Sequence, residues 1–182
     1  VGWIALHAGI AAGAHVICDW FNIPAAAIEP TVGPGHEAPD GGLGLTRADW
    51  EQIHGKGTAS GATFTYENGK YDVAFTDGVV TFIEIGWEAQ DGVSAADANA
   101  AVAKLIPADA VVTGTAALPA TAAGPIALVV QRLHSDTLAT WLEGGTARSD
   151  GGIVIVYQVQ APQGNAEPTI FRVSLAIERT PS

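Results

Sequence analysis

The chain has 182 residues, of which 48% are hydrophobic and 15% are charged, so it can bury a core and is not a disordered tail. Its 19 acidic and 8 basic residues give a net charge of -11, which would repel phosphate backbones and excludes nucleic acid as an expected partner. A single cysteine, Cys18, excludes an internal disulfide.

Residues 1–28 form an apolar segment, and Val1 to Cys18 contains no Asp, Glu, Lys or Arg. We interpret the segment as the remnant of an export signal or membrane anchor, which predicts a secreted or membrane-tethered protein. Two alternatives stay open. The segment could be a helix or strand of the core, or Cys18 could be a lipoprotein site, although His15 to Ile17 lack the small residue expected before a modified cysteine.

Residues 29–44 mix Pro, Gly and acidic residues and predict a linker to the folded body. His36, Glu37 and Asp40 lie within it and have the side chains of metal ligands. A loose loop offers no second shell of groups to orient such ligands, so we assign no metal site there.

A short helix is predicted from Thr46 onward. Thr46 precedes Asp49 by three residues, the spacing at which the threonine oxygen accepts from the Asp49 amide. Leu45 and Trp50 occupy the two positions of a hydrophobic staple, and Gly55 can end the helix. About two turns of helix cannot persist alone, so Trp50 must pack against the rest of the domain.

A three-stranded antiparallel meander follows, because Asn68-Gly69 and Asp77-Gly78 are both signatures of tight hairpin turns. The expected cross-strand pairs are Tyr66 with Tyr71, Phe64 with Val73, Phe75 with Val80, and Val73 with Phe82. This pairing makes one face apolar and the other polar. Beyond Phe82 the apolar residues change face, which indicates either burial on both faces or a bulge.

These motifs resemble a known pattern. The residues that carry it are Gly44-Leu45-Thr46, Trp50 and Gly55-Lys56-Gly57, followed by a strand with tyrosine and a hairpin with Asp-Gly. Residues 43–87 are similar in this respect to the SmpA/OmlA (BamE) outer-membrane assembly lipoproteins and to the β-lactamase inhibitory protein. The resemblance implies a non-enzymatic extracytoplasmic module that binds another protein through its sheet or loops, and it assigns no binding residue.

The second half begins with Gly92 to Ala98, which echoes Gly44 to Trp50. Either the chain contains a repeat or two helix caps simply share residue types. Ser94 predicts a helix that ends before Pro107, and Ser135 or Asp136 predicts another whose apolar side is Leu138, Trp141 and Leu142. Strands are predicted over Val111–Ala116, Ile126–Leu133, Ile153–Gln160 and Thr169–Glu178.

Together these elements predict an α+β domain over residues 45–182. Its antiparallel sheet would combine the meander with the later strands, and two or three short helices would pack on it. Residues 45–90 and 91–182 could instead form two α/β subunits. The oligomeric state does not follow from the sequence.

No motif in the chain specifies a reaction. His134-Ser135-Asp136 has the residue types of a catalytic triad, but chain neighbours point in different directions. His7 and His15 are poorly spaced for two ligands on one helix. A hydrolase that uses two carboxylates stays open, although no two acids stand out. We therefore assign no catalytic, binding or metal residue, and no cofactor.

The leading functional hypothesis is an extracytoplasmic, non-catalytic binding or envelope-assembly module with a protein partner. It rests on the apolar segment, the linker and the resemblance. A small hydrolase with a site assembled from distant residues is one alternative, and a structural domain of a larger envelope protein is the other.

Overall fold

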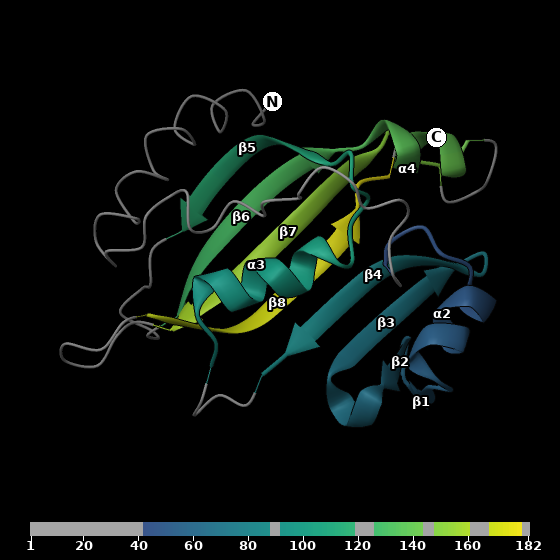
Figure 1. The fold of residues 1–182 in the computed structure, drawn as a ribbon, viewed down its shortest axis with the longest axis horizontal. Helices are drawn as coiled ribbons and strands as arrows, with labels where there is room; N and C mark the ends of the chain where they lie inside the picture. Colours follow the sequence, from purple (N-terminus) through teal and green to yellow (C-terminus); the bar gives the residue numbers. More distant parts are fainter. Residues whose placement is uncertain (1–41, 88–91, 119–125, 144–147, 161–167, 180–182) are drawn as a thin grey trace.

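The computed structural model describes residues 42–87, 92–118, 126–143, 148–160 and 168–179 (Figure 1). In chain order the strands are β1 (Thr58–Ser60), β2 (Thr63–Tyr66), β3 (Tyr71–Thr76), β4 (Val79–Gly86), β5 (Val111–Leu118), β6 (Ile126–His134), β7 (Gly152–Gln160) and β8 (Thr169–Ile177). The helices are α2 (Arg47–His54), α3 (Ala95–Ala103) and α4 (Asp136–Trp141), with a 3-10 turn, η2 (Glu67–Gly69). All eight strands form one antiparallel sheet in the order β1-β2-β3-β4-β8-β7-β6-β5.

The predicted α+β class is wrong, because the described part of the chain is largely β. Its longest α-helix, α3, has 9 residues, whereas β6, β7 and β8 have 9 residues each and belong to the same sheet. The caps correctly marked where helices begin. They do not set helix length, and the pairing of strands far apart in the chain leaves no local signal.

The predicted helix starts are confirmed. The hydroxyl oxygens of Thr46 and Ser94 accept from the amides of Asp49 (3.2 Å) and Asp97 (3.1 Å). Ser135 does the same for α4 by accepting from the Leu138 amide at 3.0 Å. Each oxygen satisfies an amide that has no partner within its helix.

Trp50 packs as its staple position predicts. Its side chain is fully buried, and its ring stacks on His54 with centroids 4.0 Å apart and meets the edges of Tyr66 and Tyr71. Trp141 was expected on the apolar side of α4, and its ring does lie beside Leu138 where both approach Gly44, but it is not part of the core. It is 43% exposed.

The first hairpin has the predicted register, with Tyr66 opposite Tyr71. The second differs beyond Phe75. Phe75 lies opposite Val80 as expected, but Ala74 rather than Val73 lies opposite Phe82, so Thr81 is an extra residue in a bulge. The bulge explains the change of face noted in the sequence, because it places Val80, Ile83 and Ile85 together in the core.

The sheet consists of two similar halves joined through β4 and β8. In the first half, the residue before the α2 cap, Leu45, accepts from the Val80 amide at 2.8 Å. In the second, the residue before the α3 cap, Val93, accepts from the Ile170 amide at 2.9 Å. In each half, a backbone hydrogen bond therefore links the residue before the helix to the start of the last strand.

The two bulges also occupy equivalent positions in the two halves. If Val80 is aligned with Ile170, the extra residue Thr81 of β4 is aligned with Phe171, which is the extra residue where β8 pairs with β7. Glu84 is then aligned with Ser174, and these two lie opposite each other where the halves meet. A pseudo-two-fold axis therefore passes between Glu84 and Ser174.

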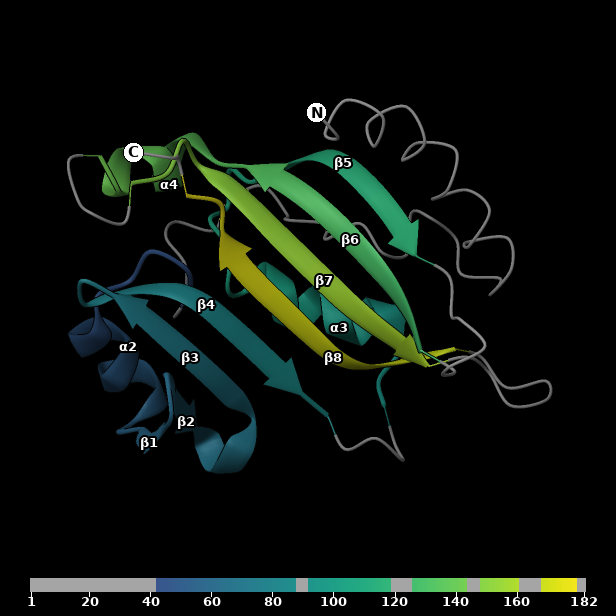
Figure 2. The ribbon, with the colours of Figure 1, turned by 180° about the vertical axis from the view of Figure 1, so that it is seen from behind.

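The helices and the core lie on one side of the sheet. α3 crosses β7 and β8 on the face nearer the viewer in Figure 1, and in Figure 2 it is behind the strands. One apolar cluster extends from Trp50 in the first half to Ala98 and Val102 of α3 and to Tyr157 in the second half. Leu43, assigned to the linker by the sequence, is fully buried in this cluster, and its amide donates to Leu105 O at 2.9 Å.

Several sequence predictions lie outside the described residues. They concern the apolar segment 1–28 with Cys18, His7 and His15, and the polar residues His36, Glu37 and Asp40 of the linker. Among the helices that the structure does describe, none has both the length and the apolar character needed to cross a bilayer.

Candidate functional site

The face of the sheet opposite α3 is the candidate site, because no described helix covers it (Figure 2). One row of directly opposed residues crosses this open face through all eight strands. We call it the central row: Thr58, Thr65, Asp72, Glu84, Ser174, Val156, Val130 and Ala116. Side chains of directly opposed residues share a face, so these eight lie on one surface.

The first half of the central row is polar and internally bonded. Thr65 Oγ1 donates to Asp72 Oδ1 at 2.6 Å, and Ser174 Oγ donates to Glu84 Oε2 at 3.1 Å. Arg172 Nη1 lies 3.4 Å from Glu84 Oε1. Asp72 and Glu84 are directly opposed like charges, and these hydrogen bonds and the guanidinium offset their repulsion.

In the second half the central row is apolar beyond Ser174, because its remaining members are Val156, Val130 and Ala116. Val156 and Val130 stand at the positions that the pseudo-two-fold axis relates to Asp72 and Thr65, and both are half-buried. Leu128 and Val154 share this face in the second half and are also half-buried, with Gln158 and Arg132 directly opposite them on the same face, and Phe82 lies on this face in the first half. Apart from Glu84 and Ser174, equivalent positions of the central row thus carry hydrogen-bonding groups in the first half and aliphatic groups in the second.

Such a surface can bind a partner that offers an apolar patch beside hydrogen-bond donors or cations. Half-buried aliphatic side chains gain free energy when a partner removes them from water, by about 25 cal/mol per Å² of apolar area. Carboxylates such as Asp72 and Glu84 accept hydrogen bonds and give the contact an orientation.

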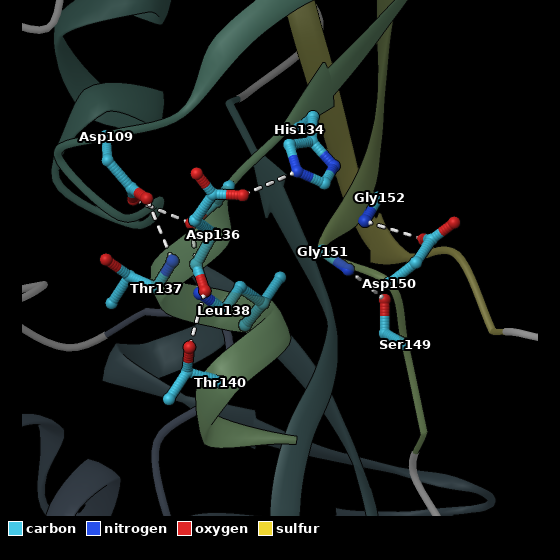
Figure 3. Close-up of polar contacts among 11 residues, drawn as sticks. Asp109, His134, Asp136, Thr137, Leu138, Thr140, Ser149, Asp150, Gly151 and Gly152 are labelled. Atoms are coloured by element: carbon cyan, nitrogen blue, oxygen red, sulfur yellow. Dashed lines mark hydrogen bonds and ion pairs between the residues drawn. The ribbon is translucent and has the colours of Figure 1, made fainter. Parts of the chain in front are cut away.

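Ser135 is not placed to act as a nucleophile with its neighbour His134. Its side chain is fully buried, and Oγ donates to Asp109 Oδ1 at 2.6 Å while it accepts from the Leu138 amide. His134 Nε2 instead lies 3.0 Å from Asp136 Oδ1 (Figure 3). Ser135 therefore belongs to the α4 cap, whereas His134 and Asp136 contact each other, and the three residues are not arranged as a catalytic triad.

Asp109 completes the α4 cap, and sequence reasoning missed it. Its second oxygen, Oδ2, accepts from the Thr137 amide at 2.8 Å (Figure 3). Desolvation raises the pKa of this carboxyl, but the hydrogen bonds from Ser135 and Thr137 outweigh it and hold the pKa below its ordinary value. Asp109 and Ser135 are far apart in the chain, and no local pattern links them.

A second polar contact holds the aromatic cluster around Trp50. His54 Nδ1 lies 2.6 Å from Glu67 Oε1, and Lys70 Nζ lies 3.1 Å from Glu67 Oε2. The hydrogen bond with His54 has the largest effect and lowers the pKa of Glu67, and the contact with Lys70 lowers it further. Desolvation raises this pKa but is outweighed, so the pKa lies below its ordinary value. These contacts join the end of α2 to the β2–β3 turn, which is a structural role.

Within the described ranges, no three His, Cys, Asp or Glu residues are grouped as a metal site would require. Comparisons of the chain with protein-family models, curated proteins and solved structures yielded no match. The function is therefore inferred from the chemistry of the described residues together with the sequence patterns.

Proposed function

We propose that the chain is an extracytoplasmic, non-catalytic binding module that holds a partner protein against the open face of its sheet. The observation that carries this proposal is the central row, which spans all eight strands and is polar at one end and apolar at the other. The sequence resemblance to protein-binding envelope modules supports the same class of function. The apolar segment 1–28 supports the location.

The bonding of the polar residues favours binding over catalysis. Thr65 and Ser174 donate to the carboxylates beside them, and Ser135 is fully buried in the α4 cap. A nucleophile requires a base within hydrogen-bond reach and access to a substrate. The same groups are suited to fix a surface that a partner contacts, because their hydrogen bonds orient the side chains before binding.

The proposal is tested by placing a charge in the apolar half. The variant is Val156→Arg, and the control is Ala100→Arg on the exposed side of α3. Each tagged protein is incubated with an envelope extract of the source organism, and the retained proteins are quantified by mass spectrometry. Val156→Arg should weaken retention of a partner about tenfold or more, about 1.4 kcal/mol of binding free energy, because the arginine must be desolvated.

Circular dichroism must show both variants folded. Ala100→Arg should retain the partner as the wild type does. Equal retention by the wild type and both variants would contradict binding through the open face, and so would a loss of retention caused only by Ala100→Arg.

A further inference from the structure

The two edges of the sheet occupy equivalent places in the two halves but differ in length and exposure. β1 has 3 residues, whereas β5 has 8, reads VVTGTAAL and contains no charged residue and no proline. Val111 is 60% exposed and Leu118 is 54% exposed. Short strands, charges and proline are the usual protection of a sheet edge. β1 is protected by its shortness, whereas β5 lacks all three features and has only a bulge near its start.

No residue of the described ranges pairs with the outer side of β5, which is the last strand in the order. In an edge strand, alternate residues direct their amide and carbonyl groups away from the sheet, and these groups can pair with another extended strand. A bulge lies between Val112 and Gly114. The regular part of the edge is therefore Gly114 to Leu118.

We propose that β5 is a dimerisation edge, at which the β5 strands of two copies of this chain pair antiparallel with Ala116 opposite Ala116. The proposal is independent of the proposed function, because it concerns the edge rather than the open face.

The side chains of β5 fit this register. Gly114, Ala116 and Leu118 lie on the open face, opposite Arg132, Val130 and Leu128 of β6. Pairing centred on Ala116 places Leu118 of each copy opposite Gly114 of the other. A Cβ atom at Gly114 would meet nothing within 4 Å, so the leucine finds space there. Ala116, at the centre, is small enough to face itself.

The charge distribution also favours a second copy. Among the described residues, the half with β1 to β4 holds 6 acids and 3 bases, a net charge of -3, and the half with β5 to β8 holds 6 acids and 5 bases, a net charge of -1. β5 belongs to the less acidic half, and β1 lies at the opposite edge. Pairing through β5 therefore keeps the more acidic halves at the two far ends of the joined sheet, where their repulsion is smallest.

The same pairing extends the open face. The apolar end of the central row terminates at Ala116, so the row would continue from Val156 and Val130 of one copy into Val130 and Val156 of the other. The joined central row would be apolar at its centre and polar toward each end.

The oligomeric state of the full chain is measured by sedimentation velocity over a concentration series. The wild type should reach the mass of two chains. Ala116→Lys should raise the dimer dissociation constant about tenfold or more, because two ammonium groups meet at the axis. Ala59→Lys makes the same substitution on the other edge strand, β1, and should leave the dimer unchanged. A mixture of Ala116→Lys and Ala116→Glu should restore it.

A cysteine version tests the register without adding charge. In a Cys18→Ser background, Ala116→Cys should form a disulfide-linked dimer on mild oxidation, because directly opposed residues have Cα atoms about 4.5 to 5.5 Å apart. Ala59→Cys in the same background is the control and should stay reduced. If circular dichroism shows that the charged variants do not fold, this cross-linking measurement tests the pairing of β5 in their place.

A wild type that is monomeric at every concentration would overturn the proposal. A dimer that Ala59→Lys weakens as much as Ala116→Lys would overturn it as well. Equal cross-linking of Ala116→Cys and Ala59→Cys would show that β5 has no special part in association.

Discussion

Glu84 and Ser174 lie directly opposite each other on β4 and β8, and Ser174 Oγ donates to Glu84 Oε2 across the junction of the two halves. The junction divides the central row into chemically different parts. Asp72 and Glu84 carry carboxylates in the first half, whereas Val156 and Ser174 stand at the equivalent positions in the second. An architecture with two similar halves thus presents an asymmetric surface, and the proposed partner would bind it in one orientation.

Trp50 should be the most costly truncation in the first half. Trp50→Ala should lower the free energy of unfolding by about 3 to 5 kcal/mol, because it leaves a cavity between α2 and the sheet. Trp50→Phe should cost less, since Trp50 Nε1 has no hydrogen-bond partner among the described residues. Chemical denaturation measures both values. An unchanged midpoint for Trp50→Ala would show that the ring is not in the core.

Substitutions of Gly57 and Gly86 by alanine compare a crowded position with an open one. A Cβ atom at Gly57 would lie 2.5 Å from the ring of Tyr66, which is 2% exposed and cannot move into water. At Gly86 it would meet nothing within 4 Å. Gly57→Ala should cost about 1 to 3 kcal/mol and Gly86→Ala much less. Equal unfolding midpoints for the two variants would contradict the close approach of β2 to Gly57.

Asp109 should make the α4 cap sensitive to acid. Its pKa in the folded protein lies below the ordinary value of 3.8, so its contribution to stability is present above that value and is lost as pH falls through the folded pKa. Asp109→Asn should therefore lower the melting temperature at pH 7, and the difference from wild type should shrink in strong acid.

Asp136→Asn is the control for this effect, because the Asp136 side chain is 95% exposed. Its melting curves should follow those of the wild type more closely than the curves of Asp109→Asn. A difference between Asp109→Asn and wild type that stays constant from pH 7 into strong acid would contradict the proposed role of the Asp109 carboxylate.

A chain that lacks residues 1–41 should fold. The described sheet and one apolar cluster link both halves between Leu43 and Ile177. Far-UV circular dichroism should show a β spectrum with a cooperative thermal transition. A truncated chain without such a transition would mean that the deleted residues belong to the core, and the interpretation of residues 1–28 as an export or anchor segment would fail.

The predictable parts of this fold are those whose signals lie close together in the chain. Thr46 and Asp49 mark the start of α2, and Asn68-Gly69 sets the register of Tyr66 against Tyr71. Each signal acts over a few residues, where side-chain hydrogen bonds and turn geometry decide the backbone.

The remaining parts depend on contacts that the chain makes at a distance. The change of apolar face beyond Phe82 indicated either burial on both faces or a bulge, and only the pairing with β3 and the burial of Ile83 and Ile85 decide for a bulge at Thr81. The pairing of Glu84 with Ser174 and the bond between Ser135 and Asp109 join segments with separate local patterns. The open face could not be recognised from the sequence, because its central row collects one residue from each strand.

The central claim is that a partner protein binds the open face, and site-specific photo-crosslinking tests it most directly. A photoreactive amino acid is placed at Val156 or Val130 on that face and, as a control, at Ala100 on α3. The proteins are expressed in the source organism, irradiated and resolved by mass. We predict a discrete crosslinked partner from Val156 and Val130 and none from Ala100. Crosslinks from Ala100 alone, or none from either valine, would contradict the claim.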